Sequence, residues 1–367
     1  MEKERIVFLD YVRALACLMV ILVHSSENFY LAALEGAPSG EMVDVVCKIM
    51  SEDAKTWVSI IDGFCRISVP LFMITSAYLL CPMREGQPWG EFYKRRALRI
   101  VPPMIVFMVL YSVLPLLWGG TTPELAWKNL LYCPLNFPGA AGHFWFLYPL
   151  LSLYLFIPMI SPWLQKATAK QERFFLILWL LSTTMSFFNR FGMQVFGQVW
   201  WNPYHGLFIF SGYLGYLVLA HYIRFHIHWS DAKRLAVGIP CAVIGIVATI
   251  LSFYVQVEVG VEKDPNLMEI GWCFCTPNVV LGTFGTFLIF TTLHKPLPGY
   301  GLIKDISKLS YGMYLMHMFY LVMFAGILGD KMAVHFAIPA IALSTYVACY
   351  LTTKVISLIP GNKWIIG

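Results

Sequence analysis

The stretch RIVFLDYVRALACLMVILVHSSENFY, residues 5–30, decides the fold class. It is long and apolar enough to cross a bilayer, because a transmembrane helix needs about 20 predominantly apolar residues. It nevertheless carries Asp10, Arg13 and His24 along its length. A charge at the bilayer centre costs about 2.5–3.5 kcal/mol on insertion scales. These side chains are therefore expected to face other helices or a hydrated cavity.

Similar apolar runs recur through the whole chain of 367 residues, which is 58% hydrophobic and 13% charged. A soluble domain typically carries about 25% charged residues. We therefore predict an all-α, polytopic membrane protein with about ten transmembrane helices, forming a single domain over residues 1–367. The expected spans are 7–31, 58–81, 101–118, 144–164, 174–190, 204–223, 235–256, 278–293, 309–328 and 333–357.

The basic residues sort to one side of these spans. If the N-terminus is cytoplasmic, 19 of the 26 Lys and Arg residues fall on the cytoplasmic side. The positive-inside rule then predicts that both termini are cytoplasmic. The net charge of +5 follows from this topology and implies contact with membrane lipids but no nucleic-acid partner. Homo-oligomerisation stays open.

Arg13 and His24 are eleven residues apart, which on an α-helix is about 20° past three full turns and about 16 Å of rise. They therefore share one helix face. Asp10 is expected to pair with Arg13 at i,i+3, and Glu27 lies one turn from His24 on the same side. One interpretation is a packing ion pair with a helix-to-helix contact, and the other is a functional face that runs from a cation to an imidazole.

The basic run KRRALRIVPP, residues 94–103, precedes the third expected span. Its two prolines predict a separate interfacial helix over 91–100, because proline breaks a preceding helix and suits the start of the next. Its arginines suit either lipid headgroups or a polyanionic ligand such as coenzyme A. They are Arg95, Arg96 and Arg99.

Asp62 and Arg66 stand at i,i+4 with the acid first, which is the favourable order for a helical ion pair. They lie near the outer end of the second expected span. Both a structural pair and a role in acceptor binding are consistent with this position.

Two further stretches place histidines in spans. HFWFLYPLLSLYLFIP, residues 143–158, begins with His143 and Trp145, which suit either an outer site or an aromatic belt. In SYGMYLMH, residues 310–317, Tyr314 and His317 share a helix face, which suits a helix-to-helix hydrogen bond as well as chemistry. The nine cysteines include no CxxC pair, and no metal is expected.

Together these stretches resemble the acyltransferase 3 family of bacterial membrane enzymes. The chain resembles most closely the short members without an appended esterase-like domain, of the type that O-acetylates enterobacterial common antigen. It departs from the family where Ser76-Ala77 replaces a frequent Ser-Gly. The matching elements are the R-x10-H spacing of Arg13 and His24, SVPLFMITSAYL, KRRALRIVPP, HFWFLYPLLSLYLFIP and SYGMYLMH.

The resemblance implies transfer of an acyl group, usually acetyl, from cytoplasmic acyl-CoA (acetyl-CoA) to a hydroxyl of an extracytoplasmic glycan or lipid-linked sugar, in the bacterial inner membrane. Arg13, with the three arginines of the basic run, would hold the donor phosphates. His24, oriented by Glu27, would act as general base or carry the acyl group itself, since an imidazole pKa of about 6.5 suits proton transfer. Candidates for the oxyanion donor are Asn28 and His317. The remaining supporting residues are Asp10, Asp62, Arg66, His143, Trp145 and Tyr314.

Buried Arg, Asp and His also mark transport pathways, so a transporter or flippase for a polysaccharide precursor is the main alternative. Such proteins often show paired segments broken by Gly or Pro, and we find no such pair in this sequence. A membrane sensor or scaffold is a third class, but it would not need a face that joins a cation to a histidine.

Overall fold

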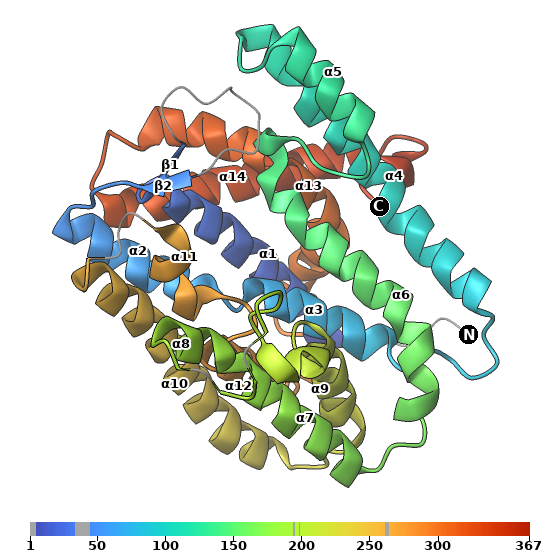
Figure 1. The fold of residues 1–367 in the computed structure, drawn as a ribbon. Helices are drawn as coiled ribbons and strands as arrows, with labels where there is room; N and C mark the ends of the chain where they lie inside the picture. Colours follow the sequence, from blue (N-terminus) through green and yellow to red (C-terminus); the bar gives the residue numbers. More distant parts are fainter. Residues whose placement is uncertain (1–4, 34–44, 194, 198, 261–263) are drawn as a thin grey trace.

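The computed structural model describes residues 5–33, 45–193, 195–197, 199–260 and 264–367. Helices dominate these residues (Figure 1), and their one small sheet pairs β1 (Leu31–Ala33) with β2 (Val45–Cys47) in antiparallel order. The predicted all-α class is therefore confirmed for the described part of the chain.

The α-helices follow the apolar runs, and several begin where a Ser or Thr side chain accepts a hydrogen bond from the backbone of the first turn, as Ser51, Thr122 and Ser230 do. They are α1 (Val7–Glu27), α2 (Glu52–Cys65), α3 (Ser68–Leu80), α4 (Trp89–Val113), α5 (Pro123–Tyr132), α6 (Leu147–Leu164), α7 (Ala169–Thr183), α8 (Met185–Arg190), α9 (Leu214–Phe225), α10 (Asp231–Glu258), α11 (Pro265–Met268), α12 (Pro277–Phe290), α13 (Tyr300–Leu328) and α14 (Val334–Ser357). Short 3₁₀ helices join them: η1 (Leu114–Trp118), η2 (Gly139–Phe146), η3 (His205–Phe210), η4 (Ile270–Trp272) and η5 (Asn362–Trp364).

Within the described ranges, 8 helical segments are long and apolar enough to cross a membrane. Two of the ten expected spans are divided in the structure: 174–190 falls on α7 and α8, and 204–223 falls on η3 and α9. Helices α7 and α9 have only 15 and 12 residues. These lengths fall short of the about 20 residues that a straight crossing requires. The chain is a multi-pass membrane protein, and the count of ten and the side of the termini stay predictions.

Helix α1 lies among α2, α3, α13 and α14 (Figure 1). It is apolar around most of its circumference, as expected for a helix enclosed by others. Its buried side chains include Val12, Ala16, Cys17, Met19 and Ile21. The polar groups of α1 therefore face protein, as the opening stretch predicts.

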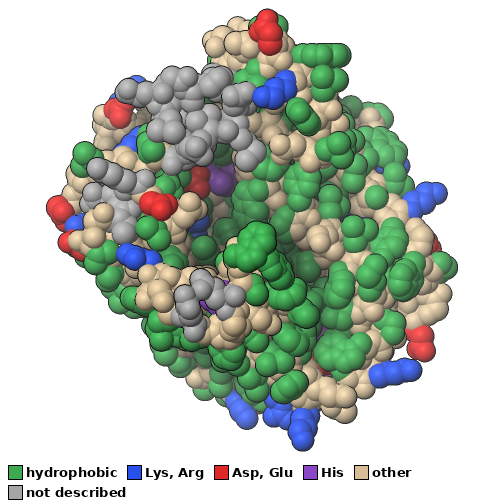
Figure 2. Space-filling model, in the orientation of Figure 1, with side chains coloured by type: hydrophobic (Ala, Val, Ile, Leu, Met, Phe, Trp, Pro, Cys, Tyr) green, Lys and Arg blue, Asp and Glu red, His purple; other side chains and the backbone are tan. Residues whose placement is uncertain are grey.

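Helix α10 has one exposed apolar face and one face packed against α12. Figure 2 shows hydrophobic side chains over much of one face of the molecule, with charged side chains mainly near its margins. On the other side of α10, a Cβ on Gly245 would lie 2.2 Å from the backbone nitrogen of Gly282, so only glycine permits this close helix contact. The exposed apolar stripe of α10 comprises Ile239, Val243, Ile244, Val247, Leu251 and Val255.

The basic run does not form a separate helix over 91–100. Helix α4 continues through Pro102 and Pro103 to Val113, so that prediction is wrong. Membrane helices tolerate internal prolines where neighbouring helices satisfy backbone groups. Beside these prolines, the hydroxyl of Tyr311 on α13 donates to the carbonyl of Ile100 at 2.8 Å and ties α13 to α4. The basic residues therefore lie on the same helix as an apolar segment long enough to cross a membrane.

Candidate functional site

The buried carboxylate of Asp10 does not pair with Arg13. It accepts hydrogen bonds from Arg5 Nε at 2.6 Å, from the Tyr300 hydroxyl at 2.6 Å and from the Ser307 hydroxyl at 2.7 Å. The predicted i,i+3 pair is therefore wrong. Arg5, which lies just before α1, donates to both oxygens of the carboxylate and takes the place expected for Arg13. Asp10 ties α1 to α13 and leaves Arg13 available for another partner.

Arg13 lines a cavity of about 140 Å³ together with Arg96 and Arg99 of α4. We call this space the basic cavity. Within the described part of the chain, the guanidinium groups of Arg13 and Arg99 make no hydrogen bond or ion pair, and the buried Nε of Arg96 has no partner. Three unpaired cations in one pocket suit a polyanion such as a phosphate group. The other lining residues are Phe72, Ser76, Leu79, Leu80, Ile100, Phe146, Leu147, Leu150, Tyr154, Ser307, Ser310, Tyr311 and Tyr314.

Arg95 lies outside the basic cavity. It projects from the exposed side of α4 and pairs with Glu91, one turn earlier on the same helix. Successive residues of an α-helix point about 100° apart, so Arg95 and Arg96 face different surroundings. Four arginines are predicted to hold the donor, and three of them, Arg13, Arg96 and Arg99, meet in the basic cavity.

Three histidines from distant parts of the sequence meet beside α1. The ring centroids of His24 and His317 lie 5.2 Å apart, and those of His143 and His317 lie 4.5 Å apart. His143 comes from η2 and His317 from α13, and both are buried. We call these residues the histidine cluster. All three are candidate site residues in the sequence, but only packing shows that they form one group.

His24 and Glu27 form a hydrogen-bonded pair, with 2.6 Å between Nδ1 and Oε2. The carboxylate accepts, so Nδ1 carries the proton. Among the residues that the structure describes, Nε2 of His24 has no hydrogen-bond partner. An imidazole with its proton held at one nitrogen and a free lone pair at the other has the arrangement of a general base.

Several polar atoms of the histidine cluster are unsatisfied. His317 donates from Nδ1 to the carbonyl of Tyr314 at 2.6 Å, which leaves Nε2 buried with no partner in the described chain. Both ring nitrogens of His143 are likewise buried and unpaired. Buried polar atoms without partners are uncommon in proteins and call for an explanation, such as a bound ligand or water.

An ion pair with several supporting contacts holds the C-terminal end of α1 near His24. Arg66 Nε donates to Asp62 at 2.6 Å, as the i,i+4 spacing predicts, and Asp62 also accepts from the Ser26 hydroxyl at 2.9 Å. The Tyr30 hydroxyl accepts from Arg66 at 3.1 Å and donates to Glu269 at 2.6 Å. Ser26, Tyr30 and Glu269 give no recognisable sequence signal, since their partners lie far away in the chain.

Tyr314 belongs both to the lining of the basic cavity and to the surroundings of the histidine cluster. Its ring centroid lies 5.4 Å from that of His143 and 5.8 Å from that of His317, and its hydroxyl donates to the His143 carbonyl. His24 does not itself line the cavity. Trp145 lies to one side, stacked on Phe274 with a centroid distance of 5.3 Å.

The face of the molecule drawn in Figure 2 has a hollow, in which acidic, histidine and basic side chains are visible among hydrophobic ones. Fold and site together define a multi-pass membrane protein with an internal polar site between its helices.

The chain matches the family described as "Acyltransferase domain", the acyltransferase 3 family, over residues 6–354. Because this match covers nearly the whole chain, the protein belongs to that family and is a membrane acyltransferase. No curated protein and no solved structure matches the chain.

Proposed function

We propose that the protein transfers an acyl group, most simply acetyl, from cytoplasmic acyl-CoA to a hydroxyl of an extracytoplasmic glycan or lipid-linked sugar. The observation that carries this proposal is the position of Tyr314, which joins the basic cavity to the histidine cluster. Phosphates held at one end would place an extended thioester arm towards the His24–Glu27 pair.

The arginines support a donor with phosphate groups. Arg13, Arg96 and Arg99 offer guanidinium donors that match phosphate oxygens in geometry and charge. Each charge-assisted hydrogen bond contributes about 1.5–3 kcal/mol. The rise of about 16 Å between Arg13 and His24 along one helix suits an extended pantetheine arm.

In the proposed reaction, Nε2 of His24 removes the proton of the acceptor hydroxyl as the oxygen attacks the thioester carbonyl. The new C–O bond forms and the C–S bond breaks, and the imidazolium returns its proton to the leaving thiolate. Glu27 stabilises the imidazolium through Nδ1–H. In the alternative route, Nε2 of His24 attacks the thioester carbonyl and CoA leaves as the thiolate. The acceptor hydroxyl then takes the acyl group from Nε2, and its proton goes to that thiolate.

The oxyanion donor is best assigned to His143. Asn28 uses its amide nitrogen on the carbonyls of His24 and Ser25 at 3.1 and 3.2 Å. A neutral His317 has its N–H committed to Tyr314 and presents only a lone pair at Nε2. A neutral His143 keeps one unpaired N–H in either tautomer, as an oxyanion donor requires.

We infer that the enzyme lies in the inner membrane of a bacterium. The sequence resemblance makes enterobacterial common antigen one candidate acceptor. Comparing surface glycans by mass spectrometry from cells with and without the gene would identify the acceptor by a lost acyl mass.

The decisive experiment mixes purified protein in nanodiscs with acetyl-CoA and a surface-glycan extract, and measures release of the CoA thiol together with acylated product. Product formation that requires both His24 and Glu27 would support the proposal. A protein that moves a glycan precursor across liposomes without chemical change would instead be a transporter or flippase.

A further inference from the structure

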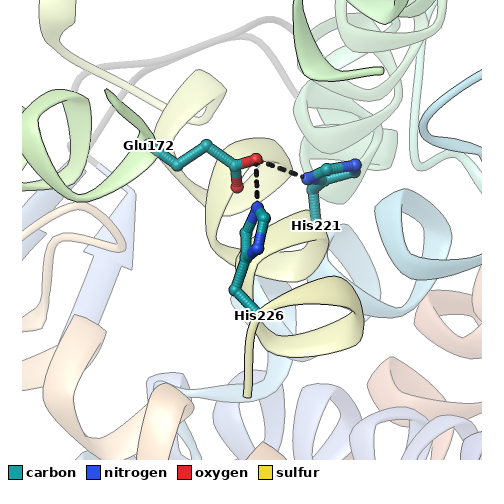
Figure 3. A group of neighbouring side chains, drawn as sticks. All are labelled: Glu172, His221 and His226. Atoms are coloured by element: carbon teal, nitrogen blue, oxygen red, sulfur yellow. Dashed lines mark hydrogen bonds and ion pairs between the residues drawn. The ribbon is translucent and has the colours of Figure 1, made fainter. Parts of the chain in front are cut away.

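A second group of titratable side chains lies away from the proposed active site, where the start of α7 meets the end of α9 (Figure 3). Glu172 stands in the first turn of α7. His221 lies in α9, and His226 directly follows this helix. Among the described residues, these three form the one group of His, Cys, Asp and Glu side chains with the composition and proximity of a metal site.

The three side chains converge on one point. Oε1 of Glu172 lies 2.9 Å from Nδ1 of His221 and 2.9 Å from Nε2 of His226. One ligand atom from each residue lies within 4.8 Å of the other two. Figure 3 shows both rings turned towards the carboxylate from the α9 side.

Burial makes this arrangement costly without a cation. Glu172 is 0% exposed and His221 is 4% exposed. The second carboxylate oxygen, Oε2, is buried and has no hydrogen-bond partner in the described chain. A buried carboxylate with an unpaired oxygen carries a large desolvation cost, which is normally offset by pairing or by metal coordination.

The donor set matches zinc. Two imidazoles and one carboxylate are the protein ligands of His₂Glu zinc sites, whose fourth position holds water. In a tetrahedral site with bonds of about 2.0–2.1 Å, neighbouring ligand atoms lie about 3.3 Å apart. The two 2.9 Å contacts would therefore widen by a few tenths of an ångström. The side chain of His226 is 20% exposed, which gives the fourth position access to water.

We propose that Glu172, His221 and His226 bind one zinc ion that clamps the start of α7 to the end of α9. On binding, each ring moves its proton to the nitrogen that faces away from the ion, so the neutral imidazoles lose no net proton. The ion stabilises the contact between two short helices, of 15 and 12 residues.

The sequence predicts no metal site, because its cysteines form no CxxC pair and Glu172 is far from both histidines in the chain. His221 and His226 are five residues apart, which is a weak signal, and Glu172 precedes His221 by 49 residues. Only the packing of α7 against α9 brings them together.

The test uses full-length protein in detergent, purified without a metal-affinity tag, and measures transition metals by inductively coupled plasma mass spectrometry. Wild type should hold about one zinc ion per chain. Glu172→Gln and His221→Ala should lose it, with zinc affinity weakened at least about 100-fold. The matched control is His228→Ala, an exposed histidine outside the cluster, which should keep the ion.

A second measurement covers variants that fold poorly. Removing metal from wild type with a chelator should lower its Tm, and adding zinc should restore it, because a ligand of the native state stabilises that state. Zinc-edge X-ray absorption should show nitrogen and oxygen ligands without sulfur. A wild-type protein that binds no zinc after reconstitution, that holds a different metal, or whose zinc survives both substitutions would overturn the proposal.

Discussion

The Tyr314 hydroxyl donates a hydrogen bond to the backbone carbonyl of His143, so one side chain forms part of the wall of the basic cavity and also holds the segment that carries a cluster histidine. The ring therefore borders the basic cavity and also lies beside the rings of His143 and His317. In the proposed reaction, a thioester that enters from the arginines would have to pass this ring.

Replacing Tyr314 with a small residue should allow thioester cleavage without transfer of the acyl group to the acceptor. Tyr314→Ala removes the ring between cavity and histidines, so water should reach the thioester and acyl-CoA should be hydrolysed without acceptor. Tyr314→Phe keeps the ring and should show much less hydrolysis, although it loses the hydrogen bond. The rate of CoA thiol release, measured with and without glycan, distinguishes the two variants. Equal acceptor-independent rates in wild type and Tyr314→Ala would contradict a separating role.

His24→Ala should abolish acyl transfer, and Glu27→Gln should lower kcat by about 10²–10⁴-fold, because the imidazole loses its tautomer control and the charge that stabilises its protonated form. The measurement is product formation at saturating acyl-CoA. The control is His294→Ala, since His294 forms an exposed pair with Asp231. Full transfer by His24→Ala would remove His24 from the chemistry.

The effect of replacing an arginine on acyl-CoA binding should depend on whether that arginine lines the basic cavity. Arg13→Ala, Arg96→Ala and Arg99→Ala should each weaken acyl-CoA binding by about 10- to 150-fold, the equivalent of one lost charge-assisted hydrogen bond of about 1.5–3 kcal/mol. Arg95→Ala should leave binding unchanged, because Arg95 points away from the cavity and pairs with Glu91. Calorimetric titration with CoA checks this. A loss in Arg95→Ala equal to that in Arg13→Ala would mean that only the total basic charge matters.

The buried pair of Asp62 and Arg66 should contribute strongly to the stability of the region around the C-terminal end of α1. Removing one partner of a buried ion pair costs about 3–5 kcal/mol, because the other charge stays buried and unpaired. Arg66→Ala should therefore lower the Tm in detergent more than the double variant Asp62→Ala/Arg66→Ala does. Asp231→Asn, in an exposed pair, should change the Tm little. A double variant less stable than Arg66→Ala would contradict this expectation.

Both termini should lie in the cytoplasm. A green fluorescent protein fused to the C-terminus should fluoresce, and alkaline phosphatase fused there should be inactive, because 19 of the 26 basic residues then lie on the cytoplasmic side. Fusions in the loop 257–277 should give the opposite result. Active phosphatase at the C-terminus would reverse the topology and place the arginine end of the cavity outside.

The sequence alone determined the helical membrane fold, the cation and imidazole that share α1, and the pairs Asp62–Arg66 and His24–Glu27. These features depend on hydropathy and on spacing within one helix, which are local properties. Helix lengths were less certain, since α4 continues through two prolines that predict a break.

Only the tertiary structure decided which distant side chains meet. It joined Asp10 to Arg5 and gathered His24, His143 and His317 into one cluster. It also grouped Glu172 with two histidines at the end of α9. The physical reason is that such contacts arise where helices pack against one another. The partners are then chosen by the positions of whole helices in space and leave no periodic signal along the chain.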